Sequence, residues 1–194
     1  IKSQRPNYPA LFAVYITLGS TATDMSLPPH LVPFWSDYAK TTSAAIEERF
    51  YEAFSFGDSE ELANDLAALV LRGTKRATAG ALWSYEAEGK RLPRTGDLSI
   101  VTDWSGQPLC VIETLSVEVV PFNGVTADFA ATEGEGDGSL SFWRGAHRAY
   151  FTRECVNLGR EFTENMLISC ERFAVVYRPT TSAAQAPSHR GPLS

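Results

Sequence analysis

The feature that most constrains the fold is a sharply bounded amphipathic segment, DSEELANDLAALVLRG, at residues 58–73. Asp58 can cap the free amides at its start, and Glu61 follows three residues later in a capping-box arrangement. Gly73 comes after the last apolar residue, where a left-handed C-terminal cap belongs. The apolar positions recur at helical spacing: Leu62, Leu66, Leu69 and Val70. The segment therefore predicts a helix with one apolar stripe, which must pack against another element.

Beyond Gly73 the hydrophobic pattern becomes typical of β-strands. Two segments, DLSIVTDW (97–104) and PLCVIETLSVEVVPF (108–122), are rich in strand-forming residues, and Ser105-Gly106 between them indicates a hairpin. A turn at 95–97 leads into the first of these segments, and CERFAVVYRP (170–179) predicts a closing strand.

Further helices are predicted on both sides of these strands. Aromatic residues at helical spacing indicate a helix around Phe34, Trp35 and Tyr38, and the segment 44–57 is predicted to continue as a helix that ends near Gly57. The segment 126–138 reads as a short helix followed by a glycine-rich acidic loop, and 139–159 as a second long helix. With no repeat and no internal linker, we expect one α+β domain with a strongly bent sheet or small barrel.

Composition narrows the class of function. The chain is 44% hydrophobic and 21% charged, which is ordinary for a globular protein, and its net charge of −6 argues against a general nucleic-acid coat protein. Six basic residues against two acids between Arg72 and Arg94 nevertheless predict a basic edge of the sheet. Three widely spaced cysteines and three histidines do not make a zinc site, so we expect no metal and no cofactor.

The ends of the chain are expected to lie outside the domain. Residues 1–25 are interpreted as a non-essential N-terminal extension, with Met25 a plausible natural start, because the apolar run ALFAVYITLG is too short to span a bilayer. The polar, proline-containing residues 180–194 are predicted to be a disordered tail. A single domain is thus expected at 26–179, in a protein of the reducing cytoplasm.

Several motifs together resemble the ASCH-domain family, and more narrowly its short stand-alone bacterial branch. They are LRGTKRATAGALW, TGDLSIVTDW, CVIET, EVVPF, FAATEGEGDGSLSFWRGAHRAYF and CERFAVVYRP, and the resemblance covers roughly residues 34–179. It implies a PUA-like fold, which is a small mixed β-barrel of about five to six strands with flanking helices. It also implies a cleft suited to RNA or nucleosides.

The resemblance also implies site residues. The family motif Gly-x-Lys-x-x-Thr corresponds here to Gly73, Lys75 and Thr78. Some small relatives are amidohydrolases that act on N4-acetylcytidine with a lysine, a threonine and a glutamate, and these carry over to Lys75, Thr78 and Glu133. Other ASCH proteins are ribonucleases in which the same lysine is implicated. This chain differs from the amidohydrolases by its longer helical N-terminal part, and by ATAGAL where they have an arginine after the threonine.

The implied chemistry places two demands on the structure. Thr78 is a poor nucleophile unless a base removes its proton, and Lys75 can be that base only if its pKa falls toward neutrality; Glu133 would then carry a proton to the leaving amine. Residues three apart on a strand face opposite sides, so Lys75 and Thr78 converge only if residues 73–76 form a turn or bulge. The alternative is an ordinary helix C-cap, with the cations complementing the helix dipole.

Six further residues are hypothesised to bind substrate or RNA: Arg76, Trp83, Trp104, Glu113, Arg144 and Arg148. The tryptophans can stack on a base or simply pack in the core, and the two arginines four residues apart on one helix can meet phosphate. Glu113 either faces solvent or pairs with Lys75 or Arg76. For Glu133 and Glu135, the alternative to a functional role is that they lie in a solvated acidic loop. His147 is interpreted as a packed or surface residue.

Three functions remain open from the sequence. The first is a small hydrolase acting on an N4-acylcytidine-type nucleoside, with Lys75 as base, Thr78 as nucleophile and Glu133 as proton shuttle. The second is a metal-independent single-stranded ribonuclease, in which Lys75 stabilises the phosphorane. The third is a binding module that recognises RNA or a modified nucleoside without chemistry. The acidic net charge favours a small ligand, and the basic patch keeps RNA as an alternative.

Overall fold

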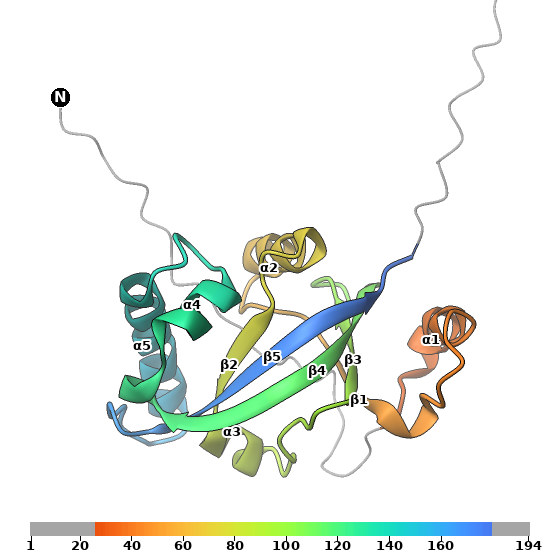
Figure 1. Cartoon of the computed structure of the whole chain (residues 1–194). Helices are drawn as coiled ribbons and strands as arrows, with labels where there is room; N and C mark the ends of the chain where they lie inside the picture. The colour runs from red at the N-terminus through yellow and green to blue at the C-terminus, as the bar shows by residue number, and fades with distance from the viewer. Residues whose placement is uncertain (1–25, 180–194) are drawn as a thin grey trace, which may run out of the picture.

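A five-stranded mixed sheet with helices around it forms the fold of the computed structural model, which describes residues 26–179 (Figure 1). The strands are β1 (Phe50–Phe54), β2 (Ala77–Ala81), β3 (Leu98–Thr102), β4 (Pro108–Pro121) and β5 (Leu167–Tyr177). The helices are α1 (Val32–Ala39), α2 (Glu60–Arg72), α3 (Leu82–Ala87), α4 (Ala127–Glu133) and α5 (Leu140–Asn157), with 3₁₀ turns at Pro29–Leu31, Glu47–Arg49 and Phe122–Gly124. The predicted extension and tail lie outside the described residues.

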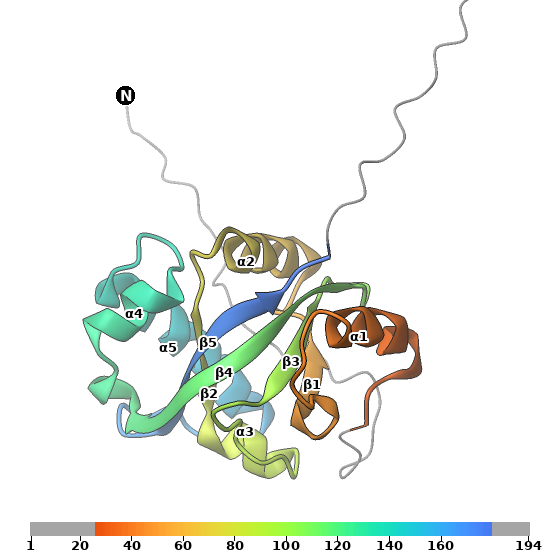
Figure 2. The ribbon, with the colours of Figure 1, turned by 45° about the vertical axis from the view of Figure 1, so that its right-hand side comes forward.

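The strand order β1-β3-β4-β5-β2 places the first two strands of the chain at opposite edges of the sheet. Strand β1 pairs with β3 in parallel, while the β3–β4, β4–β5 and β5–β2 pairs are antiparallel. The β3–β4 pair is the hairpin predicted at Ser105-Gly106. The two long strands β4 and β5 run diagonally through the molecule and are strongly twisted (Figures 1 and 2). The predicted α+β class, with about five to six strands and flanking helices, is confirmed.

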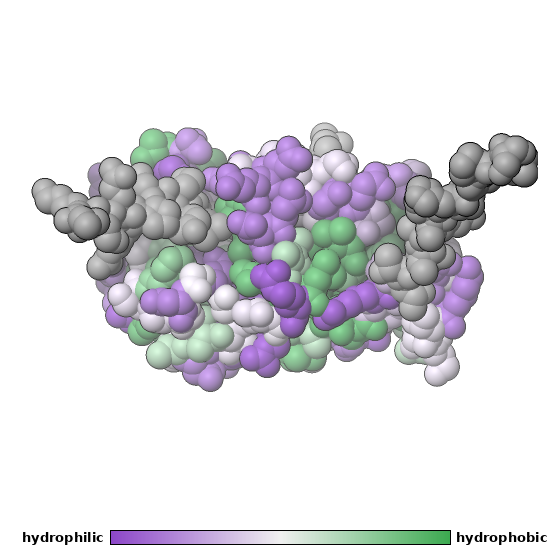
Figure 3. Space-filling view, turned by 90° about the horizontal axis from the view of Figure 1, so that it is seen from above, coloured by the Kyte–Doolittle hydropathy of each residue, from purple (hydrophilic) through white to green (hydrophobic). Residues whose placement is uncertain are grey.

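Three apolar clusters hold the helices against the sheet. One packs α4 and α5 on β2 and β5, a second packs α2 on β3, β4 and β5, and a third surrounds α1. Helices α4 and α5 lie together at one end of the molecule and α1 at the other (Figures 1 and 2). Alternation along β5 assigns Cys170 to the first cluster and Phe173 to the second, so these two clusters lie on opposite faces of that strand. Seen from above, hydrophobic surface remains visible between hydrophilic side chains (Figure 3).

Two sequence-based predictions about the first half of the chain need correction. Residues 44–57 do not form a helix, because Phe50–Phe54 forms the edge strand β1. The helix α2 is real and ends at Gly73 with φ of 78°, but its N-terminal cap is Ser59, whose hydroxyl accepts from the amide of Leu62, instead of Asp58. The short helix α3 was not anticipated from the sequence at all.

Candidate functional site

The end of α2 sets the position of Lys75. Gly73 has a left-handed backbone, and the amides of Thr74 and Lys75 both donate to the carbonyl of Leu69, 2.9 and 3.2 Å away. The chain then leaves the helix and enters β2 only at Ala77, so residues 73–76 form the turn that the sequence analysis required. Lys75 is 1% exposed, which makes it far more buried than a lysine in an ordinary helix cap.

Two carboxylates face the ammonium of Lys75. Its Nζ lies 2.6 Å from Oε1 of Glu135 and 3.1 Å from Oε1 of Glu133, and both carboxylates are buried. Glu133 ends α4, and Glu135 stands one residue beyond Gly134, which has φ of 67°. A Cβ at Gly134 would lie 2.5 Å from the carbonyl oxygen of Thr74, so the glycine allows the acidic loop to approach the turn after α2.

Glu133 is also held from the other side by α5. The indole Nε1 of Trp143 donates to its Oε2, and Nε2 of His147 lies 3.7 Å from the same oxygen. The His147 ring stacks on Trp143 with centroids 4.0 Å apart. Burial by itself raises the pKa of Glu133, but Lys75, His147 and Trp143 together outweigh burial and lower it to about 2. Glu133 is therefore a fixed carboxylate.

The pKa of Lys75 is shifted upward, in the direction opposite to what a lysine base requires. Burial in a dry site lowers it, but the charges and hydrogen bonds of Glu133 and Glu135 raise it by more. Lys75 is consequently a buried ammonium. The condition for Lys75 to act as a base, a pKa lowered toward neutrality, is therefore not met, because two carboxylates dominate its surroundings.

A hydrogen-bond donor and an acceptor at this ion pair have no protein partner within residues 26–179. Two of the three ammonium protons of Lys75 point to Glu133 and Glu135, and Nζ otherwise sits over the ring of Phe56 at 5.3 Å from its centroid. The Oε2 atom of Glu135 is buried and makes no hydrogen bond there. An unsatisfied carboxylate oxygen is costly in a dry site, so Oε2 of Glu135 can accept a hydrogen bond from a bound molecule.

Thr78 lies on β2, on the face opposite the core that β2 shares with α4 and α5. It is 2% exposed and stands directly across from Glu171 of β5. Glu171 accepts a hydrogen bond from the hydroxyl of Thr114 at 2.6 Å. Two residues further along the same face, Phe173 contacts Phe56, whose ring also lies under the Lys75 ammonium. The Phe56 ring thus lies near both the Lys75 ammonium and the face of β5 that carries Glu171, and no hydrogen bond joins Lys75 to Thr78 among the described residues.

The other predicted binding residues divide into those near the site and those away from it. Arg76 is exposed directly beside Lys75, but Trp83 is buried in the core with Arg160 over its ring. Trp104 is 36% exposed at the β3–β4 hairpin. Glu113 is partly exposed and forms an ion pair, which was one of the two predicted alternatives. Its partner is Arg49 at 2.7 Å, however, instead of Lys75 or Arg76.

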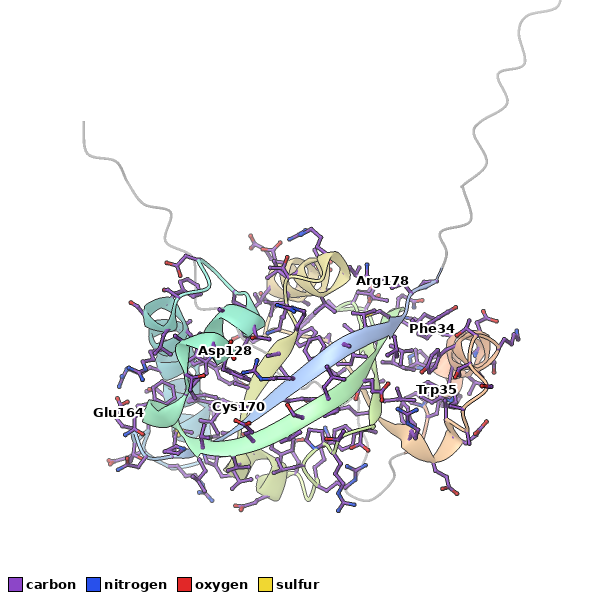
Figure 4. The ribbon with its side chains drawn as sticks, viewed as in Figure 1. Phe34, Trp35, Asp128, Glu164, Cys170 and Arg178 are labelled. Atoms are coloured by element: carbon purple, nitrogen blue, oxygen red, sulfur yellow. The ribbon has the colours of Figure 1, made fainter. Side chains whose placement is uncertain are left out.

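The two α5 arginines are engaged within the protein. Arg144 donates to the carbonyl of Asn123 at 3.0 Å, and Arg148 pairs with Glu164 and lies over Phe122. They are not brought to Lys75. Figure 4 shows Asp128 of α4 near the sheet and Cys170 on β5 below it, with Glu164 at the outer end of this region. His147 is packed, as predicted, at 4% exposure.

The sequence analysis missed the roles of Trp143 and Glu171. A signal for Glu171 was present, since it interrupts the apolar closing strand LISCERFAVVY at a position where alternation points it inward. The hydrogen bond from Trp143 to Glu133 could not be predicted from the spacing of residues in the sequence. Within residues 26–179 no group of three or more metal-ligating side chains comes together, and none of the helices there is both long and apolar enough to cross a bilayer.

Comparisons with known proteins agree with this architecture. Residues 52–177 match the ASCH domain. The crystal structure of an ASCH domain from Lactobacillus crispatus JV V101 has 40% sequence identity and a TM-score of 0.73, over 85% of this chain and all of that one. A protein from Enterococcus faecalis V583 has 32% identity and a TM-score of 0.68, over 84% of this chain and 98% of that one. No curated protein matches. With its family match and its five-stranded sheet, the chain belongs to the ASCH-domain family.

Proposed function

We propose that the protein hydrolyses the amide bond of an acylated nucleoside of the N4-acylcytidine type, at the pair formed by Lys75 and Glu135. The observation that carries this proposal is the unpaired donor on Lys75 beside the unpaired Oε2 of Glu135. A secondary amide presents one carbonyl acceptor and one N–H donor, so it complements this pair.

In this proposal Lys75 acts through its charge. Its third N–H donates to the carbonyl oxygen of the substrate and stabilises the negative charge that develops on it in the tetrahedral intermediate, while Glu135 Oε2 accepts from the amide N–H. The site is buried, so few water molecules compete with these interactions. Its raised pKa keeps Lys75 protonated, as this role demands.

Thr78 is the nucleophile of the proposal, and Glu133 holds Lys75 in place. With a pKa of about 2, Glu133 is too weak a base to carry a proton near neutral pH, so we assign it positioning instead of the proton transfer expected from the sequence. Substrate reaches the buried pair only if the loop at 134–138 moves aside. Three glycines with positive φ lie in that loop: Gly134, Gly136 and Gly138.

The test is to incubate the full chain with N4-acetylcytidine and to separate cytidine by chromatography. We expect turnover that falls at least about a hundredfold in Thr78→Ala and in Lys75→Met, the latter assayed where circular dichroism shows it to be folded, since each removes a group acting in the transition state. Glu135→Gln should retain the fold and raise KM, because its amide offers a weaker acceptor. Lys40→Met is the control, since the Lys40 ammonium pairs with Asp37 at the surface. Turnover that survives Lys75→Met would refute the proposal.

Binding of RNA is the second candidate, because ASCH domains are commonly RNA-binding. The observation that favours it is the exposed Arg76 next to the buried Lys75. The same protein should be tested against mixed-sequence single-stranded RNA. Cleavage that is lost in Lys75→Met and kept in Thr78→Ala would favour a ribonuclease. Binding without cleavage that weakens in Arg76→Gln would favour a binding module.

A further inference from the structure

Thr78 and Glu171 stand opposite each other on neighbouring strands, and we infer that Glu171 is the general base that takes the hydroxyl proton of Thr78. The inference rests on the proposed function, in which Thr78 attacks an acyl group. Glu171 takes the role of general base, which Lys75 cannot have because a buried ammonium cannot accept a proton.

The register of the sheet places the two side chains within reach. Thr78 of β2 pairs directly with Glu171 of β5 in the antiparallel ladder, so both side chains leave the sheet on the same face. Residues paired in this way have Cβ atoms about 4.5–5.5 Å apart. The carboxylate oxygens of a glutamate lie three bonds beyond its Cβ, so they can meet the threonine hydroxyl directly or through one water molecule. Both residues are buried, with 2% and 6% exposed.

Thr114 on β4 orients the carboxylate. Its hydroxyl donates to Oε1 of Glu171 at 2.6 Å, and this bond joins two buried side chains. Because the Thr114 hydroxyl binds Oε1, Oε2 is the oxygen that we assign to accept the Thr78 proton. An acceptor oriented by a third group, next to a hydroxyl nucleophile, is the arrangement by which proteins activate serine and threonine.

The surroundings of Glu171 suit a group that both takes up and returns a proton. Burial, with the carboxylates of Glu52 on β1 and Asp97 before β3, raises its pKa to about 7, while the Thr114 hydrogen bond opposes part of this. Lys90 pairs with Glu52, and Arg91 pairs with Asp97 at 2.5 Å, so each of those two neighbouring carboxylates has a cation beside it. A base with a pKa near the working pH is close to the optimum for general base catalysis.

The steps balance without any co-reactant other than water. Glu171 accepts the Thr78 proton while Oγ1 bonds to the acyl carbon, and the protonated carboxyl then gives this proton to the amine nitrogen as the C–N bond breaks. In the second half Glu171 takes a proton from water as the water oxygen bonds to the acyl carbon. It returns a proton to Oγ1 when the ester C–O bond breaks, and the carboxylic acid leaves.

A generic acyl donor tests the base without depending on the natural substrate. We would treat the full chain with p-nitrophenyl acetate over a range of pH on both sides of neutrality. The rate of p-nitrophenolate release and the acetylation of the Thr78 peptide by mass spectrometry would both be followed. The variants are Thr78→Ala, Glu171→Gln and Thr114→Val, each checked for an intact unfolding transition.

The expected result is acetylation at Thr78 with a rate that rises with pH around a midpoint near 7. Glu171→Gln should slow it at least about a hundredfold and abolish the pH dependence. Thr114→Val should keep the rate at high pH but move the midpoint upward, because it loses a hydrogen bond that lowers the pKa of Glu171. A merely structural role for Glu171 would not produce that shift.

Two different results would overturn the inference: one concerns the base and the other the nucleophile. If Thr78 is acetylated equally fast and with the same pH profile in Glu171→Gln, another group is the base and the proposed function stands. If the wild-type protein releases p-nitrophenolate without any acetyl group at Thr78, the nucleophile itself is wrongly assigned, and the inference falls together with that part of the proposed function.

Discussion

The ammonium nitrogen of Lys75 lies 2.6 Å from Oε1 of Glu135, in a site where their side chains are only 1% and 7% exposed. The two residues come from the turn after α2 and the loop after α4, which are far apart in the sequence. Their ion pair therefore joins two loops that the sheet does not connect. Because two carboxylates surround one lysine, the site carries net negative charge, and this composition decides which groups in it can transfer protons.

Replacement of Lys75 by methionine should strongly destabilise the fold. The change keeps a long unbranched side chain, one atom shorter than lysine, but removes the cation that Glu133 and Glu135 face in their buried site. Breaking a buried pair on one side typically costs about 3–5 kcal/mol. We expect a loss of this size in the free energy of unfolding in urea at neutral pH. Lys40→Met, at the exposed pair with Asp37, should change the transition little. Equal effects of the two replacements would contradict a dry, buried ion pair at Lys75.

Low pH should reduce the stability of the folded protein, because Glu133 becomes protonated. The folded protein holds its pKa at about 2 against an ordinary value of 4.5, so its contribution is fully present above about pH 4.5 and is lost as the pH falls toward 2. A shift of this size corresponds to about 3 kcal/mol. We expect the difference in unfolding free energy between wild type and Glu133→Gln to shrink over this window. A difference that stays constant from neutral pH downward would show that the carboxylate charge is not the source.

The elements predicted correctly from the sequence are those specified by neighbouring residues. Helix α2 carries its apolar stripe and the Gly73 cap within one short segment, and the β3–β4 hairpin carries its own turn. The strand β1 was predicted as part of a helix over residues 44–57. Its conformation is decided by parallel pairing with β3, which lies more than forty residues away.

The candidate site was predictable only in part for the same reason. The positions of Lys75, Thr78 and Glu133 followed from the resemblance to a family, but the direction of the Lys75 pKa depends on two carboxylates that approach it from another element. Charge partners set by tertiary structure cannot be assigned from spacing. The pairing of Glu113 with Arg49 instead of Lys75 is a second example.

Gly134→Ala should disrupt the site more than Gly138→Ala does. Both glycines have positive φ in the same loop, so both replacements carry a backbone cost of about 1–2 kcal/mol. At Gly134 the new Cβ would also lie 2.5 Å from the Thr74 carbonyl oxygen, whereas at Gly138 the nearest atom is 4.0 Å away. We expect the larger loss of stability for Gly134→Ala, with a shift of the Trp143 indole N–H resonance as Glu133 moves. An equal loss in both variants would show that the loop can relax away from Thr74.

Stability should fall between mildly acidic and neutral pH because of Glu171. Its pKa is raised to about 7 in the folded protein, so the stabilisation by its proton is fully present below the unfolded value of about 4.5 and is lost as the pH rises through 7. The full effect corresponds to about 3 kcal/mol. Glutamine resembles the protonated carboxyl in shape but does not ionise, so Glu171→Gln should keep its stability over this range while wild type loses it. The measurement is the free energy of unfolding in urea across that pH window. If both proteins show the same slope, Glu171 is ionised at neutral pH at no cost to the fold, and burial is not what sets its pKa.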